Sequence, residues 1–382
     1  MTRVPVKPEL LRWARERAGL NQEDLAVRFR KLPDWERGET QPTLKQLEAF
    51  ARTVHVPFGY LFLDQPPDER LPIADFRTVA DTAKFDASPD LIDTLYAMQR
   101  RQAWLRDHLF GNGAEPLTFA ASAHLGDDPV AVGREMRRTL GLNGGWAAGV
   151  RSWRDAVNEL RRIIDQVGVM AVINGVVGND THRRLSVEEF RGFALTDQYA
   201  PLIFVNGADA KSAQMFTLAH ELAHVWLGEG GLSGFESLLP GGTEVEDWCN
   251  RAAAEFLVPS RELREAWTQA RREENPFEAL ARSFKVSPVV AARRAMDLKL
   301  IGRSSFLEFY ESYTNQERDS GAPSSRRDFY NNPNTRVGKH FATHVIGAAM
   351  EGEIGFREAY ELTGLWGGTF QDYAGKLGIM LS

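Results

Sequence analysis

The sequence lacks several features that would each assign it to a class of protein. Its 382 residues contain one cysteine, Cys249, so no disulfide can form within the chain. No run of apolar residues approaches the roughly eighteen that a membrane-spanning helix needs, and residues 1–7 lack the apolar segment of a signal peptide. We therefore expect a protein that stays in the cytoplasm and has no part in a membrane.

An excess of positive charge is also missing. The chain carries 46 Lys and Arg against 52 Asp and Glu, a net charge of −6, which argues against a protein that wraps nucleic acid along its whole length. An apolar fraction of 43% with 26% charged residues is typical of a globular chain with ordered cores. Any contact with nucleic acid should therefore be local.

Changes in composition divide the chain into four parts, and the fold class we predict is α+β, predominantly helical. A helical, helix-turn-helix-like domain with its linker occupies residues 1–75, and its boundary falls in a proline-containing linker that runs from 64 to 87. A helical supporting region follows at 76–165, with helices expected at 88–109, 128–140 and 148–166.

The third part, residues 166–300, should hold a small sheet and further helices. The fourth, residues 301–382, should be mostly helical with a flexible segment at 317–338. Within the third part we expect strands at 168–173, 190–195 and 201–205, a glycine-rich loop at 228–242, and helices at 245–258 and 260–299.

The N-terminal domain carries a recognisable run of residues. Asn21 with Asp24 three positions later predicts a capped helix start. The run Trp35-Glu36-Arg37-Gly38, followed by Pro42, resembles the helix-turn-helix of phage-repressor-like regulators, where such a run closes the recognition helix. That resemblance covers about fifty residues.

The chain departs from that pattern where DNA would be read. Too few residues separate Leu25 from Trp35 for a turn plus a full recognition helix, and Pro33 falls inside that helix. Asp34 and Glu36 are expected to face the phosphate backbone and repel it. Residues 1–63 hold 11 Lys or Arg and 8 Asp or Glu. DNA binding and a protein-binding or structural role both stay open, and the candidate contacts are Arg28, Arg30, Lys31 and Arg37.

The most informative segment is Phe216 to Leu227. It places His220 and His224 four residues apart with Glu221 between them, so that a helix presents both imidazoles on one face as a metal pair. We expect the opposite face of this helix to be buried and the face with the histidines to be polar. A third ligand must come from elsewhere, since a catalytic zinc site has three protein ligands and an open position.

Candidates for the third ligand lie downstream. Gly230 stands where the metzincin pattern has its third histidine, which excludes that branch. Glu246, Glu244 and Glu255 remain, and Glu246 is favoured because it falls in the first turn of its predicted helix, with Asn250 one turn later on the same face. Cys249 could approach the metal, although a small packed residue is the simpler interpretation.

Two motifs together resemble a known family. The run Phe216 to His224, followed by the run Glu246 to Pro259 with Asn250 four residues after the glutamate, resembles the ImmA/IrrE zinc metallopeptidases over roughly residues 165–300. The resemblance implies a zincin-like domain that binds Zn²⁺ through His220, His224 and Glu246 in a gluzincin-like arrangement. It also implies an intracellular endopeptidase that cleaves a helix-turn-helix repressor in stress response or mobile-element control.

The residues suggest roles for other groups as well. Glu221 would act as the general base, Asn250 would orient a ligand, and an oxyanion donor is sought among Tyr199, His182, His340 and His344. His340 and His344 also stand four apart, but packing is favoured over a second metal site because no third ligand is evident. The predicted strand that ends at Val205 is either an edge strand that pairs with substrate or a plain core strand.

An alternative function stays open beside the peptidase. The chain could be a DNA- or protein-binding transcriptional regulator, or the antitoxin of a toxin-antitoxin pair, in which the metal site is structural or weakly active. Its partner would then be a toxin or a promoter rather than a substrate.

Overall fold

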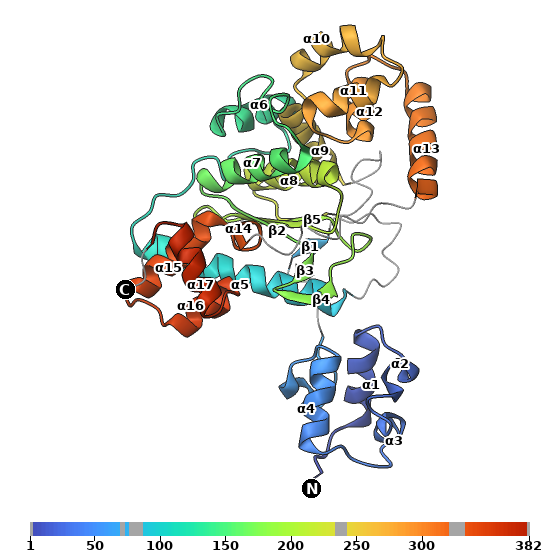
Figure 1. Cartoon of the computed structure of the whole chain (residues 1–382), viewed down its shortest axis with the longest axis vertical. Helices are drawn as coiled ribbons and strands as arrows, with labels where there is room; N and C mark the ends of the chain where they lie inside the picture. Colours follow the sequence, from blue (N-terminus) through green and yellow to red (C-terminus); the bar gives the residue numbers. More distant parts are fainter. Residues whose placement is uncertain (1–2, 69–72, 76–86, 234–242, 321–332, 380–382) are drawn as a thin grey trace. The chain divides into compact units, whose positions relative to one another are not determined.

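A computed structural model describes residues 3–68, 73–75, 87–233, 243–320 and 333–379 (Figure 1). The chain separates into two compact units, residues 1–72 with 81–96 and residues 73–80 with 97–382. The described part is predominantly helical with a small mixed sheet, so the predicted fold class is confirmed. None of its helices is long and apolar enough to cross a membrane. The four-part division of the chain stays a prediction.

The first unit is a small bundle of short helices. Its core contains Leu11, Phe29, Trp35, Leu47 and Phe50, all nearly inaccessible to solvent. The side chain of Asn21 accepts the backbone N–H of Asp24 and the Asp24 carboxylate accepts that of Asn21, so the predicted helix start is confirmed. The elements are α1 (Pro8–Arg17), α2 (Gln22–Ala26), α3 (Leu32–Glu36), α4 (Leu44–Thr53) and the 3₁₀ helix η1 (Phe58–Phe62).

Helix α3, at the place of a recognition helix, spans five residues. One expectation about it was wrong: Glu36 does not face outward. Its side chain is 3% exposed and accepts hydrogen bonds from Arg15 Nε at 2.7 Å and Gln22 Nε2 at 2.6 Å. Glu36 therefore holds α3 against α1, and only Asp34 of the pair remains toward solvent, where it is paired with Arg37.

The second unit is built on a five-stranded sheet in the order β1-β7-β5-β6-β2. Strands β2 and β6 are parallel, β5 is antiparallel to both β6 and β7, and β1 is parallel to β7. A separate hairpin pairs β3 with β4. The strands are β1 (Ala74–Asp75), β2 (Met170–Asn174), β3 (Val176–Val177), β4 (Asp180–Arg184), β5 (Gly192–Leu195), β6 (Leu202–Asn206) and β7 (Gly231–Ser233).

The three strands predicted from the sequence are confirmed as β2, β5 and β6. Because β6 lies between β5 and β2 and is buried at every residue, the edge-strand interpretation of this segment was wrong and the core-strand interpretation holds. Strands β1, β3, β4 and β7 were not predicted. Residues 234–242 of the predicted glycine-rich loop lie outside the described residues, as do 69–72 and 76–86 of the linker.

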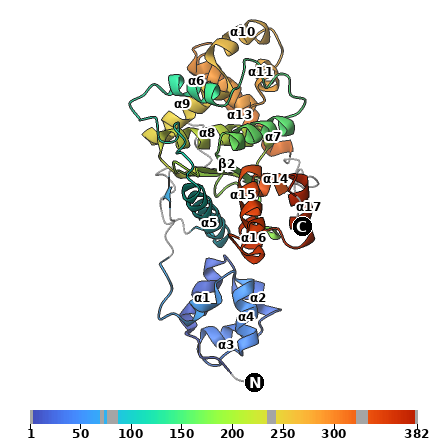
Figure 2. The ribbon, with the colours of Figure 1, turned by 90° about the vertical axis from the view of Figure 1, so that its left-hand side faces the viewer.

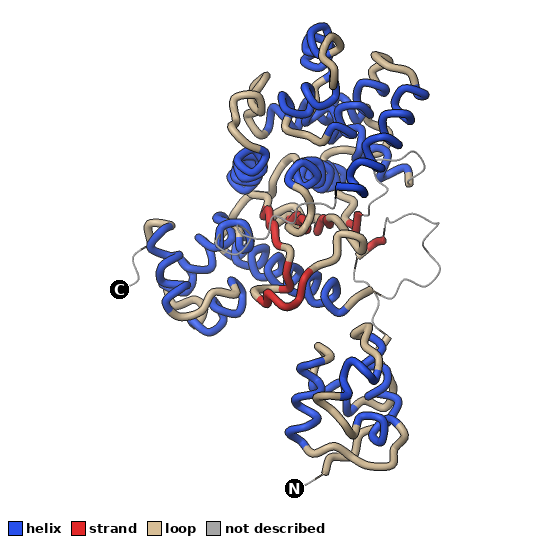
Figure 3. Tube along the Cα trace, turned by 45° about the vertical axis from the view of Figure 1, so that its right-hand side comes forward, coloured by secondary structure: helices blue, strands red, loops and turns tan. Residues whose placement is uncertain are grey.

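Helices cover both faces of this sheet. Helices α7 and α8 lie over one face, and residues 97–111 of α5 lie over the other, with the sheet in red between them in Figure 3 (Figures 1, 2 and 3). Gln102 of α5 donates to the carbonyl oxygens of Leu195 and Ala200 at the end of the β5–β6 hairpin. The helices between residues 89 and 257 are α5 (Pro89–Gly111), α6 (Pro129–Thr139), α7 (Trp153–Gln166), α8 (Lys211–Leu227) and α9 (Glu244–Leu257).

The remaining helices complete the second unit. The prediction of a flexible segment at 317–338 was wrong at both of its ends, since residues 317–320 belong to α13 and residues 333–337 form α14. Residues 321–332 lie outside the described residues. The helices are α10 (Ser260–Ala270), α11 (Pro276–Phe284), α12 (Pro288–Asp297), α13 (Arg303–Ser320), α14 (Pro333–Val337), α15 (Lys339–Met350), α16 (Phe356–Thr363) and α17 (Gly368–Lys376).

Candidate metal centre

Helix α8 carries the two histidines and is buried on all sides. Every residue from Gln214 to Leu227 is buried, because the helix packs between the sheet and helices α7 and α9. The face with the histidines is buried as well as the apolar face: His220, Glu221 and His224 are 2%, 0% and 0% exposed. Polar groups buried this deeply are costly unless they are paired with one another or with a ligand.

The C-terminal end of α8 is fixed by neighbouring backbone. Gly228 adopts a left-handed conformation with φ +77° and donates its N–H to the His224 carbonyl. The carbonyls of Val225 and Trp226 accept the N–H groups of Ala121 and Ala123 from a crossing segment. The last turn, which holds His224, therefore keeps a single orientation.

The structure brings His220, His224 and Glu246 together. The two Nε2 atoms are 3.1 Å apart, and the Glu246 oxygens lie 3.1 Å from His220 Nε2 and 3.3 Å from His224 Nε2. Among the residues that the structure describes, these three make the group of possible metal ligands whose donor atoms lie within 4.8 Å of one another. Glu246 comes from the first turn of α9, which packs along α8.

Hydrogen bonds at the far sides of the imidazoles fix their tautomers. His224 Nδ1 lies 2.8 Å from the carbonyl oxygen of Glu229, an acceptor, so Nδ1 must carry a proton. His220 Nδ1 lies 3.0 Å from Asn250 Oδ1, where it donates in the same way. In their neutral form both rings then turn the lone pairs of their Nε2 atoms toward each other and toward a carboxylate, an arrangement that a proton or a metal ion bound there would stabilise.

The size of this donor set fits a tetrahedral metal ion. Ligand distances of about 2.0–2.1 Å place neighbouring donors of a tetrahedral site about 3.3 Å apart. The two imidazole nitrogens are 3.1 Å apart, Glu246 Oε2 lies 3.1 Å from His220, and Glu246 Oε1 lies 3.3 Å from His224, all close to that value. Two imidazoles and a carboxylate leave the fourth position of such an ion open, as catalytic sites require.

Charge effects agree with a site that favours a cation. Burial alone would lower the pKa of His220, but the carboxylate of Glu246 outweighs it and raises this pKa to about 9. Burial likewise opposes the rise for His224, whose pKa reaches about 10 beside Cys249 and Glu246. Burial would raise the pKa of Glu246, yet the two imidazoles hold it far below its usual range.

Comparisons with known proteins assign this part of the chain. Residues 178–296 match the model of a peptidase family described as the IrrE N-terminal-like domain. These residues belong to the ImmA/IrrE family. Residues 337–376 match a second model, a domain of unknown function. A search of curated proteins found no match to the chain.

The ImmA/IrrE domain places Glu221 beside the metal ligands and against the sheet. An added Cβ at Gly192 of β5 would lie 2.7 Å from Glu221 Oε1 and 2.6 Å from Thr217 Cγ2, so only glycine leaves room for this carboxylate. The negative charge of Glu221 also contributes to the raised pKa of His220. Gly192 was not identified from the sequence, because its contact with Glu221 joins residues that no local pattern relates.

The other two glutamates considered as third ligand lie elsewhere. Glu244 is exposed at the start of α9, and Glu255 is buried more than two turns along α9, where it pairs with Arg134 and Arg294. Cys249, in contrast to these two glutamates, lies beside His224, with which its side chain forms a hydrogen bond. It is fully buried, and burial raises the pKa of its thiol. The carbonyl of Glu229, which orients His224, was missed because any residue can supply a backbone oxygen.

The four candidate oxyanion donors are not brought to the metal ligands by any contact that we observe among the described residues. His182 is exposed on β4, and the Tyr199 ring packs edge-on against Phe110 at 5.7 Å. His340 and His344 lie on α15, where the His344 ring contacts His108. Packing, rather than a second metal site, is also favoured here, because the described residues offer no third ligand within the same spacing.

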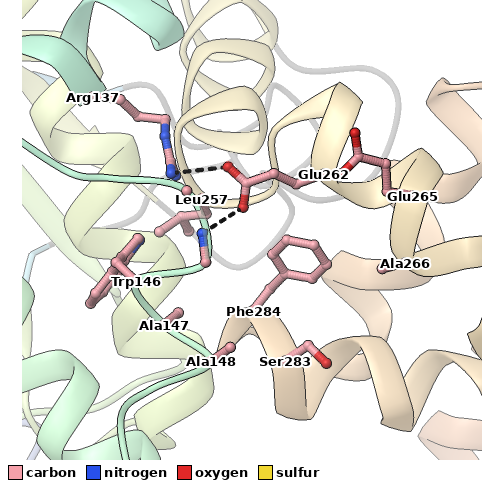
Figure 4. A pocket seen from close by; sticks show the side chains of 12 residues that line it. Arg137, Trp146, Ala147, Ala148, Leu257, Glu262, Glu265, Ala266, Ser283 and Phe284 are labelled. Atoms are coloured by element: carbon pink, nitrogen blue, oxygen red, sulfur yellow. Dashed lines mark hydrogen bonds and ion pairs between the residues drawn. The ribbon is translucent and has the colours of Figure 1, made fainter.

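A separate pocket of about 410 Å³ lies away from these ligands in the ImmA/IrrE domain and its neighbouring loop (Figure 4). At its wall Glu262 accepts hydrogen bonds from Arg137 Nη2 at 3.2 Å and from the Gly145 N–H at 3.0 Å. Arg137 also donates to the carbonyl oxygen of Phe256. Because these polar groups satisfy one another, we assign the ion pair to the packing of α6 against α9 and α10.

Proposed function

We propose that the second unit is a zinc-dependent endopeptidase. The observation that supports this most is the triangle of His220, His224 and Glu246 donors with Glu221 on the adjoining side of α8. Zinc bound there would polarise a water molecule and the substrate carbonyl. A protein substrate follows from the peptidase family to which residues 178–296 belong.

The residues of this centre would have different roles according to where they lie. His220, His224 and Glu246 would hold the ion, while Asn250 and the Glu229 carbonyl keep the imidazole rings turned toward it. Glu221 would accept a proton from water at its carboxylate and deliver it to the leaving amine. Its burial between α8 and β5 excludes bulk water, which strengthens its interaction with developing charge.

The substrate that we propose is a regulatory protein, such as a helix-turn-helix repressor, in stress response or mobile-element control. The resemblance of the two motifs to the ImmA/IrrE peptidases supports this choice. The chain also carries its own small helical unit of repressor-like sequence, which could dock onto a partner of that kind.

The proposal is tested by Glu221→Gln in the full chain. This change keeps the size of the side chain but removes the base, so the variant should bind one zinc per chain and lose at least a hundredfold in cleavage of a purified helix-turn-helix repressor. Metal content is measured by elemental analysis and cleavage by mass spectrometry of the products. Equal cleavage by variant and wild type would contradict a peptidase mechanism.

Two further variants assign the third ligand. Glu246→Ala should release the metal, whereas Glu244→Ala, which alters an exposed residue two positions away, should retain it. Loss of the metal in Glu244→Ala and its retention in Glu246→Ala would instead identify Glu244 as the third ligand.

A second candidate function is favoured by one surface of the first unit. A pocket of about 630 Å³ is lined by Arg28, Arg30, Lys31 and Lys45 around Phe29 and Trp35, and an anionic partner would fit it. Arg37, by contrast, is already paired with Asp34 and Glu39. A regulator or antitoxin that binds DNA or a toxin here would show salt-dependent binding by the full chain, weakened by Arg30→Glu with Lys31→Glu. Binding unchanged by that pair of substitutions would exclude this surface.

A further inference from the structure

The pocket of Figure 4 lies between the loop at 141–152, the ends of α6 and α9, and helices α10 and α11. Its volume of about 410 Å³ falls in the range of small-molecule sites in proteins. Most of its lining is apolar, and the side chains that make it so are those of Trp146, Ala147, Ala148, Leu257, Ala266 and Phe284. Such walls favour an apolar occupant, because binding removes apolar surface of both partners from water.

The charged groups of this pocket are already paired. Arg137 Nη2 donates to Glu262 Oε1 at 3.2 Å, and Arg137 Nη1 donates to the Phe256 carbonyl oxygen at 2.7 Å. Glu265 accepts a hydrogen bond from Arg261 Nε of the same helix at 3.0 Å. Each of the three charged side chains in the lining therefore has a partner of opposite charge. A charged molecule would lose its hydration in this pocket without gaining a partner.

The loop wall of the pocket is tied to α10. Gly145 has φ +69°, a left-handed conformation that favours glycine, and its N–H donates to Glu262 Oε2 at 3.0 Å. Arg137 Nη2 donates to the carbonyl oxygen of Asn143 in the same loop at 3.1 Å. The polar contacts thus fix one side of the cavity, and its apolar walls are left to a ligand.

The same pocket reaches the end of α9. Arg137 donates to the Phe256 carbonyl, one of the last carbonyls of this helix, which have no partner within it. Leu257, the last residue of α9, lines the pocket. It lies about three turns, or roughly 16 Å, along the helix from Glu246. A molecule in the pocket would therefore contact the helix that carries Glu246 without touching the metal ligands.

We propose that this pocket binds an uncharged, largely apolar small molecule, and that the bound molecule holds the loop at 141–152 against the last turn of α9. A ligand with an aromatic or alicyclic ring suits the walls, which include the rings of Trp146 and Phe284. None of the lining residues belongs to the metal centre, so this binding goes beyond the proposed peptidase and does not depend on it.

The first test determines the class of ligand with the full-length protein. The probes are 2-naphthol, which is uncharged near neutral pH, and two charged analogues with the same rings, a naphthalenesulfonate and a naphthylmethylammonium. Isothermal titration calorimetry should show one molecule of 2-naphthol bound per chain with a Kd of about 1 mM or lower. Both charged analogues should bind at least tenfold more weakly. Absence of saturable 2-naphthol binding, or equal binding of either charged analogue, would overturn the proposal.

The second test places the ligand in this pocket. Ala266→Phe fills the cavity from α10 and Ala148→Leu fills it from the loop, so the two variants act on different walls. Ala131→Phe, at an exposed position on α6, is the matched control. Each filling variant that folds should bind 2-naphthol at least tenfold more weakly, whereas the control should bind it as the wild type does. Wild-type binding in a folded filling variant would contradict the assignment.

Hydrogen exchange tests the link between the loop and α9. Saturating 2-naphthol should slow exchange at the amides of residues 143–148 and 254–257, because the bound molecule opposes local opening of both segments. Residues 341–349 of α15, which do not line the pocket, serve as the internal control. Slower exchange in the loop with no change in residues 254–257 would show that the ligand does not act on α9.

Discussion

Gly192 of β5 lies so close to Glu221 of α8 that any side chain at position 192 would clash with the carboxylate. A Cβ there would lie 2.7 Å from Glu221 Oε1. The sheet therefore sets how far Glu221 can extend from its helix. It thereby limits the positions that the proposed base can adopt.

Gly192→Ala should accordingly reduce peptide cleavage by at least tenfold while one metal ion per chain is retained, because it displaces Glu221 and leaves the three ligands untouched. Overpacking should also lower the free energy of unfolding by about 1–3 kcal/mol. Gly347→Ala in α15, where an added Cβ meets no atom within 4 Å, is the matched control and should preserve both quantities. Full activity in Gly192→Ala would show that the carboxylate does not depend on this contact.

Asn250 should act on the metal through His220. Asn250→Ala removes the acceptor that lies 3.0 Å from His220 Nδ1, and the affinity for zinc should fall about 10–100-fold. Asn250→Asp retains an acceptor oxygen and should bind zinc at least as well as the wild type does. Competition with a chromophoric chelator measures both affinities, and equal loss in the two variants would point to disrupted packing instead.

The part of the site that local sequence predicts is the part that a single helix encodes. His220 and His224 face one way because residues four apart share a helical face, and Glu246 with Asn250 follows the same rule on α9. Gly192 and the Glu229 carbonyl belong to the same centre but reach it through strand pairing and chain reversal. No residue pattern records those contacts, so they appear only in three dimensions.

The fold shows the same division. The strands β2, β5 and β6 are continuous apolar runs and were predicted, whereas β1 and β7 are two and three residues long and exist through pairing with each other and with β5. The burial of the histidine face of α8 could not be predicted for a related reason. Its histidines and glutamate are polar, yet α9 covers them because it supplies the third member of their cluster.

Glu36 shows how a recognised run can have a structural role. It belongs to the Trp-Glu-Arg-Gly run, but its burial depends on Arg15, twenty-one residues earlier. Glu36→Gln should lower the free energy of unfolding of the first unit by about 3 kcal/mol, because it removes the buried charged partner of Arg15 and leaves the guanidinium only the exposed Glu16. Urea denaturation followed by Trp fluorescence measures this loss. Glu23→Gln, at an exposed position on α2, should change it little.

Without metal, the stability of the folded protein should fall as pH rises, whereas a site stabilised by ionised carboxylates loses stability as pH falls. Glu246 raises the pKa of His220 to about 9 in the folded protein, above the ordinary value of 6.5 that it regains on unfolding. The folded state then binds more protons than the unfolded state between these values, so its stability is fully present below pH 6.5 and is lost as pH rises through about 9. We expect chelator-treated protein to become less stable across this window.

Zinc should reverse that slope, because it binds neutral imidazoles and displaces the protons. Zinc affinity should therefore keep increasing up to about pH 9 rather than levelling off near 6.5. Thermal unfolding at a series of pH values, with and without zinc, measures both trends. In metal-free Glu246→Gln the carboxylate that raises the pKa of His220 is absent, and the fall in stability between pH 6.5 and 9 should disappear. Persistence of that fall in the variant would place its cause outside the three-residue cluster.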